Sequence, residues 1–86
     1  MKSGKQYGRK LIFHQKGIEA FAFQLRKVRV DKGFTQSQLA FESGISLSQI
    51  ARIETARINP TISTVFVLAQ TLEISLPELF DFEFSE

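Results

Sequence analysis

Two short stretches of the chain begin in the same way, with a hydroxyl residue followed three positions later by glutamine: Thr35–Gln38 and Ser46–Gln49. This is the spacing of a capping box, in which the hydroxyl accepts a backbone N–H from the first helical turn. Gly44 lies between the two stretches. The pattern predicts short helices over residues 36–43 and 47–55. Helices this short, joined this tightly, must cross at a steep angle, which is the geometry of a helix-turn-helix unit.

Three further segments have apolar residues at helical spacing. One helix is expected over 18–32 and ends at Gly33, one begins after a cap at either Asn59 or Thr61, and a short one covers 76–81. The sequence therefore predicts an all-α, five-helix fold. The side chains expected to face its core are Phe21, Ala22, Leu25, Val28, Leu39, Ala40, Ile45, Ile50, Ile53, Ile62, Val65, Phe66, Leu68, Ala69, Leu72, Leu76, Leu79 and Phe80.

Length and composition limit the chain to one small domain. Its 86 residues are 43% apolar, enough for an ordinary core, and the absence of cysteine excludes disulfides and thiolate metal sites. The net charge of +2 is unevenly distributed: residues 1–17 carry five bases and no acid, whereas residues 73–86 carry five acids and no base. We therefore divide the chain into a basic arm (1–17), a helix-turn-helix domain (18–81) and an acidic aromatic tail (82–86).

The residue pattern does not favour an enzyme, a metal site or a cofactor. His14 is the only histidine and no cysteine accompanies it, so a zinc site is not expected. The chain has neither a glycine-rich phosphate loop nor a serine with a histidine and an acid beside it. The longest apolar run, Val65–Ala69, is much shorter than the roughly 20 residues of a membrane-spanning helix. We expect a cytoplasmic, nucleoid-associated protein.

Residues 34–54, with the segments that follow them, resemble the phage-repressor-like (lambda-repressor-like, xenobiotic-response-element) family of helix-turn-helix regulators. The matching residues are Gln36, Leu39-Ala40, Gly44-Ile45-Ser46, Ile50, Ile53-Glu54, Asn59-Pro60 and the run from Leu72 to Phe80. The resemblance covers about residues 21–80. It implies a lambda-repressor-like domain whose third helix enters the major groove of DNA.

The resemblance also implies which side chains meet base edges. These contacts map onto Leu47, Ser48, Gln49 and Arg52. Arg52 is able to bond guanine O6 and N7 together, and its alternatives are a phosphate contact or a plain surface charge. Leu47 either meets a thymine methyl group or packs on backbone sugars. Ser48 is able to bond several bases.

Phosphate contacts are expected around the same helix. Gln36 begins the second helix, where the partial positive charge of the helix end favours a phosphate. Further candidates are Ser46, Arg57 and Asn59. Gln36 and Ser46 have an alternative role as capping residues only.

Arg29 and Glu54 are assigned a structural role. In relatives, an arginine in the first helix pairs with the acid that ends the third, and these two residues occupy the matching positions. The resemblance thus implies a structural ion pair.

The sequence as a whole predicts a sequence-specific transcriptional regulator, a repressor in type, that binds double-stranded DNA as a homodimer on a palindromic operator. The alternative is an antitoxin or protein-interaction module that binds a protein partner through the C-terminal tail. Phe82 and Phe84 in that tail either form a self-association strip or dock on the protein's own surface. Residues 1–10 are expected to add non-specific affinity by contacting phosphates or the minor groove.

Overall fold

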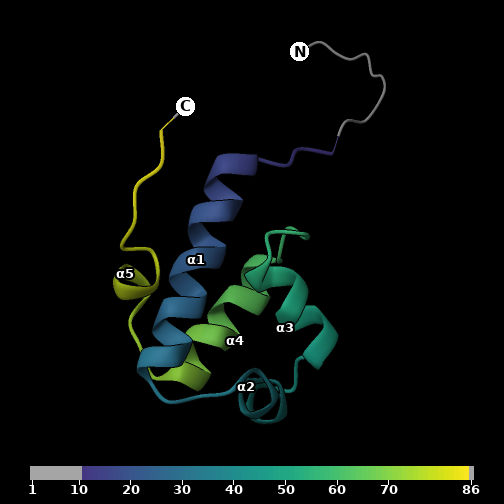
Figure 1. Ribbon diagram of the computed structural model, residues 1–86, viewed down its shortest axis with the longest axis vertical. Helices are drawn as coiled ribbons and strands as arrows, with labels where there is room; N and C mark the ends of the chain where they lie inside the picture. Colours follow the sequence, from purple (N-terminus) through teal and green to yellow (C-terminus); the bar gives the residue numbers. More distant parts are fainter. Residues whose placement is uncertain (1–10, 86) are drawn as a thin grey trace.

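A computed structural model of the protein describes residues 11–85 and arranges them as five helices with no strand in that range (Figure 1). The helices are α1 (Gln15–Asp31), α2 (Gln36–Ser43), α3 (Leu47–Glu54), α4 (Ile62–Leu72) and α5 (Leu76–Leu79). The expected all-α fold with α2 and α3 as a helix-turn-helix pair is therefore confirmed. Within the described range, no helix combines the length and the apolar character that crossing a membrane requires.

The first helix begins three residues earlier than the spacing of apolar residues predicts. His14 is its N-cap, and the Nδ1 atom of this side chain accepts the backbone N–H of Gly17 at 3.0 Å. Histidine is not among the residues that commonly cap helices, so no pattern in the sequence predicted this start. Residues 15–17 of the expected basic arm therefore belong to α1, and residues 1–10 lie outside the described range.

The turn between α2 and α3 follows the predicted signals. Thr35 and Gln38 form both bonds of a capping box at the start of α2. Gly44 ends α2 in the left-handed conformation, with φ of 79°. Ser46 then caps α3 by accepting the N–H of Gln49 at 3.1 Å. Because each helix has its own start signal and a glycine separates them, the chain turns within three residues.

The core lies between the five helices, with α2 packed against α3 and α4, and α1 packed against α3 and α5 (Figure 1). Every helix contributes at least one side chain to it. Those that are fully buried are Leu25, Leu39, Ile50, Ile53, Leu68, Leu72 and Leu79. All seven were expected in the core from their spacing.

The expected core was broader than the observed one. Ile62 and Phe66 of α4 are 61% and 46% exposed, because the inward stripe of this helix is the narrower set Val65, Leu68, Ala69 and Leu72. Leu76 and Phe80 are also partly exposed, at 40% and 42%. The α5 helix is a single turn that ends at Leu79, shorter than the expected 76–81, and only Leu79 reaches the core. Of the two candidate N-caps of α4, Asn59 and Thr61, the structure shows Thr61, whose hydroxyl accepts the N–H of Thr64.

The C-terminal segment, residues 81–85, forms no helix and lies against α1. Phe82 is half-buried against the core, with its ring centroid 5.9 Å from that of Phe80. Phe84 meets the ring of His14 edge-on at 5.0 Å. Of the two alternatives for these phenylalanines, the structure shows docking on the protein's own surface.

Gly44 provides a test of the turn. A methyl group there would meet nothing within 4 Å, so the cost of Gly44→Ala is that of the left-handed backbone alone. We expect a loss of about 1–2 kcal/mol in the free energy of unfolding, measured by urea denaturation. The control Ser37→Ala, at an exposed position of α2, should change it by less than about 0.5 kcal/mol. Equal stability of both variants would contradict the assigned strain.

Candidate nucleic-acid interface

The α3 helix has one buried side and one exposed side. Ile50 and Ile53 are fully buried and join the hydrophobic core, and α3 lies against α2 and α1. On the other side, Ser48 and Arg52 are exposed and Leu47 is 47% exposed. Positions 48 and 52 are four residues apart, so their side chains lie on one face of the helix. The predicted base-contacting side chains thus point to solvent and not into the core.

The fourth predicted base contact, Gln49, is only half-exposed. Its backbone N–H is bonded to the Ser46 hydroxyl, which places Gln49 at the third position of the helix. Ser46 itself is exposed at the tip of α3. The two residues therefore lie at the end of the helix that is expected to approach the bases.

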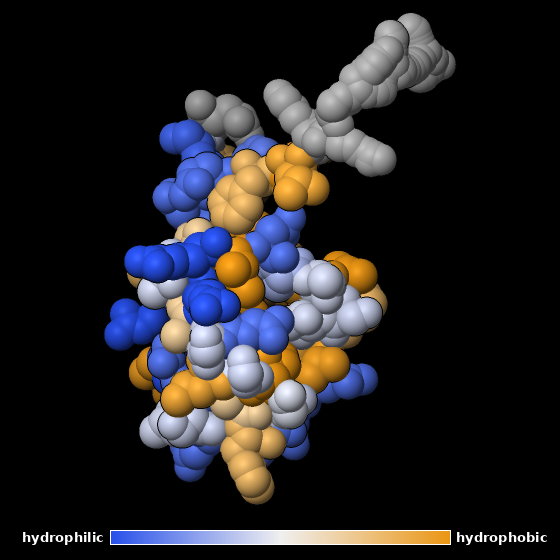
Figure 2. Space-filling view, turned by 90° about the vertical axis from the view of Figure 1, so that its right-hand side faces the viewer, coloured by the Kyte–Doolittle hydropathy of each residue, from blue (hydrophilic) through white to orange (hydrophobic). Residues whose placement is uncertain are grey.

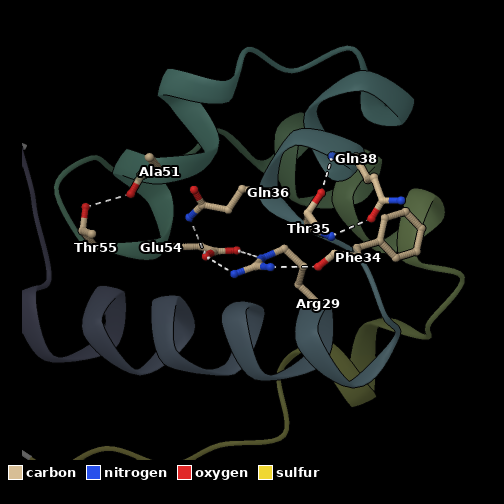
Figure 3. A network of polar contacts seen from close by, with 8 residues as sticks. All are labelled: Arg29, Phe34, Thr35, Gln36, Gln38, Ala51, Glu54 and Thr55. Carbon is tan, nitrogen blue, oxygen red and sulfur yellow. Dashed lines mark hydrogen bonds and ion pairs between the residues drawn. The ribbon is translucent and has the colours of Figure 1, made fainter.

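An ion pair fixes the other end of α3 to the rest of the domain (Figure 3). The Glu54 carboxylate accepts two hydrogen bonds from Arg29 of α1, at 2.6 Å from Nε and 3.0 Å from Nη2. The third guanidinium nitrogen, Nη1, donates to the carbonyl oxygen of Phe34 at 2.8 Å. Both charged side chains are largely shielded, 10% and 2% exposed. The predicted structural pair is therefore present, and Phe34 is an unforeseen member.

Gln36 joins the same network. The Nε2 atom of this side chain donates to Glu54 Oε1 at 3.0 Å (Figure 3). Gln36 is the first residue of α2, so one carboxylate at the end of α3 holds α1 and α2 together. The sequence pointed to Gln36 as a phosphate contact or a capping residue, and no local signal indicated the bond to Glu54, eighteen residues away.

The charge of the exposed surface follows from this network. Glu54 is the only acidic residue between 44 and 60, and its carboxylate is turned inward and neutralised by Arg29. The exposed charges of this stretch are Arg52 and Arg57, both basic. Viewed from the side of the molecule on which α3 lies, polar and apolar side chains are mixed over the surface (Figure 2). A surface with basic and few acidic groups suits a polyanion.

The chain leaves α3 through a left-handed residue. Ala56 has φ of 60°, and the N–H of Arg57 bonds to the carbonyl oxygen of Arg52 at 2.9 Å. Alanine rarely adopts this conformation, so the sequence carried no signal for it. Arg57 and Asn59, two of the predicted phosphate contacts, are exposed in the loop that follows.

Among residues 11–85, no group of three or more histidines, cysteines or acids could hold a metal ion. Two capped helices, a tight glycine turn and a second helix with one free polar side together define a helix-turn-helix domain.

The chain belongs to the helix-turn-helix family HTH_3, which matches residues 25–79. It is 42% identical over 60 residues to the transcriptional regulator SlrR of Bacillus subtilis, covering 69% of this chain and 40% of SlrR. It is 38% identical over 52 residues to the antitoxin HipB of Escherichia coli, covering 60% of this chain and 59% of HipB. The chain thus spans less than two thirds of the length of either relative.

A solved structure of similar fold contains DNA. It is the restriction-modification controller protein C.Esp1396I, as a tetramer in complex with its natural 35 base-pair operator. Its TM-score to this chain is 0.71 at 31% identity, covering 76% of this chain and 86% of that one. The resemblance seen in the sequence is therefore confirmed: the chain is a lambda-repressor-like helix-turn-helix domain, of a family of DNA-binding transcriptional regulators.

The hydrogen bonds between Arg29, Glu54, Gln36 and Phe34 predict that removing the Glu54 charge strongly destabilises the domain. Glu54→Gln removes the negative charge and leaves the guanidinium of Arg29 buried without a counter-ion, so we expect a loss of about 3–5 kcal/mol in the free energy of unfolding. The double variant Arg29→Met/Glu54→Met should recover part of that loss, since it removes both charges.

The matched control is Asp31→Asn. It breaks the exposed ion pair of Lys27 and Asp31, whose side chains are 58% and 65% exposed, and should change stability by less than about 1 kcal/mol. Chemical denaturation, monitored by circular dichroism, measures the free energy of unfolding of all three variants. A Glu54→Gln protein as stable as the control would show that the network does not hold α3.

Proposed function

We propose that this protein is a sequence-specific transcriptional regulator that places α3 in the major groove of DNA. The observation that carries the proposal is the two-sided character of α3. Its apolar side is fully buried, Ser48 and Arg52 stand exposed, and Glu54, the one carboxylate of residues 44–60, is neutralised by Arg29. A major groove about 12 Å wide admits such a helix.

Arg52 is the residue we assign to base recognition first. It lies five residues from the start of α3, on the same face as Ser48, and its side chain is exposed. A guanidinium that bonds both O6 and N7 of guanine discriminates by about 1–3 kcal/mol against another base. Ser48 is assigned hydrogen bonds to bases, Gln49 contacts at the tip of the helix, and Leu47 an apolar contact with a thymine methyl group.

The phosphate contacts are assigned to residues that flank α3. Ser46 uses its hydroxyl oxygen to accept the N–H of Gln49, which leaves the hydroxyl proton to donate to a phosphate. Gln36 donates one of its two amide N–H groups to Glu54, which leaves the other for a phosphate. Both residues thus combine a structural and a binding role. Arg57 and Asn59 supply further contacts from the loop after α3.

The protein acts as a homodimer in this proposal. A recognition helix of eight residues contacts only a few bases, so specificity requires two copies on a palindromic operator. The half-sites would be about one helical turn apart, roughly 34 Å. The assembly of C.Esp1396I on its operator supports this arrangement.

Similarity to the antitoxin HipB supports a second candidate, in which this protein also binds a protein partner. The acidic tail is the segment that would carry that contact. In the structure the tail packs on the protein's own α1, and Phe82 is half-buried there. A partner that binds the tail would first have to displace it, so DNA binding remains the favoured function.

Selection of bound duplexes from a random DNA pool tests the function. We expect a symmetric enriched site, and Arg52→Ala should relax one base position in each half-site, with a loss of about 1–3 kcal/mol per contact. Arg26→Ala, an exposed arginine on α1, serves as the control and should leave the enriched site unchanged. Absence of enrichment with the parent protein would rule the proposal out.

The basic arm gives a separate prediction. Residues 1–10 contain four of the basic residues and no acid, so deleting them should make the logarithm of DNA affinity fall less steeply with the logarithm of salt concentration. Fluorescence anisotropy at several salt concentrations measures the slope. An unchanged slope would mean that the arm does not contact phosphates.

A further inference from the structure

The helices α1, α3 and α4 end in the same hydrogen-bonded turn, the Schellman motif. One residue of this turn adopts a left-handed conformation and its N–H bonds the carbonyl oxygen three residues back, while the next N–H bonds the carbonyl oxygen five residues back. The left-handed residue is Gly33 after α1, Ala56 after α3 and Glu73 after α4. The turns after α3 and α4 therefore lack the glycine that adopts this conformation without strain.

The turn after α3 is fully bonded despite this strain. The N–H of Ala56 donates to the carbonyl oxygen of Ile53 at 3.1 Å, and the N–H of Arg57 donates to that of Arg52 at 2.9 Å. These bonds satisfy carbonyl groups that the end of an α-helix would leave without a partner in the helix. They hold Ala56 at φ of 60°, a conformation that few residues other than glycine adopt.

The residues after the turn alternate between the outside and the inside of the domain. Arg57 and Asn59 are exposed, whereas Ile58 between them is half-buried and packs against the core. The loop is thus fixed at two points, the left-handed residue and Ile58. Because of these two fixed points, the chain leaves α3 along one path, on which Arg57 and Asn59 face solvent.

Resting on the DNA-binding function proposed above, we infer that Ala56 is a positioning residue for the phosphate contacts of Arg57 and Asn59. Its side chain does not touch DNA in this inference; its backbone conformation sets the direction in which the chain leaves α3. The N–H of Arg57 is bonded to the carbonyl group of Arg52, the residue assigned to base recognition. The turn therefore fixes the phosphate contacts relative to the base contact.

The turn after α4 provides a matched comparison. Glu73 has φ of 56°, its N–H donates to Gln70 at 3.1 Å, and the N–H of Ile74 donates to Ala69 at 3.1 Å. Ile74 also packs half-buried against the core. The same conformation and the same bonds therefore occur at a place that carries none of the residues assigned to DNA.

Two substitutions at position 56 test the role of the turn. Ala56→Gly keeps the left-handed conformation and relieves its strain, so Tm should rise by several degrees and the slope of log DNA affinity against log salt should match the parent. Ala56→Val opposes the turn, because a β-branched residue strongly disfavours positive φ. Its Tm should fall, and its slope should become shallower by about one, the loss of one phosphate contact. Fluorescence anisotropy on the enriched duplex measures the slope.

The variants Glu73→Gly and Glu73→Val control for stability. Their Tm values should differ in the same direction as those of the two variants at position 56, whereas their salt slopes should equal each other. The double variant Ala56→Val/Glu73→Gly should regain stability through the second turn and still show the shallow slope. A slope that follows Tm at both positions, or a parental slope in either variant that carries Ala56→Val, overturns the inference.

Arg57→Gln completes a double-mutant cycle with Ala56→Val. By itself, Arg57→Gln should make the slope shallower by about one. The combined variant should show no further loss, because both changes remove the same contact. Additive losses would mean that the turn affects DNA binding by a route other than Arg57, and would contradict the assigned role.

Failure of this inference is distinguishable from failure of the proposed function. A parent protein that enriches no duplex from the random pool removes the function, and this inference with it. A parent that enriches a symmetric site, together with an Ala56→Val protein that keeps the parental slope, leaves the function standing and removes only the role of Ala56.

Discussion

The buried pair of Arg29 and Glu54 is the interaction on which the arrangement of the helix-turn-helix unit depends. Four hydrogen bonds at this site connect α1, α2, α3 and the carbonyl group that precedes α2. Each ionised group is nearly removed from water and would be strongly unfavourable alone, so the pair is stable only when all three helices are in place. The network therefore selects one relative orientation of α3, whereas the apolar contacts of Ile50 and Ile53 supply most of its attraction to the core.

The same network shapes the outer surface. By turning the one carboxylate of the 44–60 stretch inward, it leaves exposed side chains that are basic or neutral. A single glutamate thus has two effects, fixing the position of α3 and removing a charge that would repel phosphate. The proposed roles of Ser48 and Arg52 follow from where this helix presents them.

Much of the fold could be predicted because its signals are local. The hydroxyls of Thr35, Ser46 and Ser75 each bond a backbone N–H three residues away, so the helix starts can be read from neighbours in the chain. Apolar spacing likewise identified every fully buried side chain. The prediction failed where a helix carries more apolar residues than the neighbouring helices cover, as with Phe66 of α4 and Leu76 of α5. It also missed the start of α1, because a histidine cap has no general sequence signature.

For the site, the sequence alone determined which residues lie on the outer side of α3, since Ile50 and Ile53 mark the inner side and the helical period places Ser48 and Arg52 opposite. The pairing of Arg29 with Glu54 came from resemblance to a family, not from the residues themselves. Only the tertiary structure decided that Gln36 joins that pair, that Ala56 takes a left-handed conformation, and that the tail folds back on α1. The physical reason is range: capping and periodicity act over three or four residues, whereas these features depend on groups brought together from distant parts of the chain.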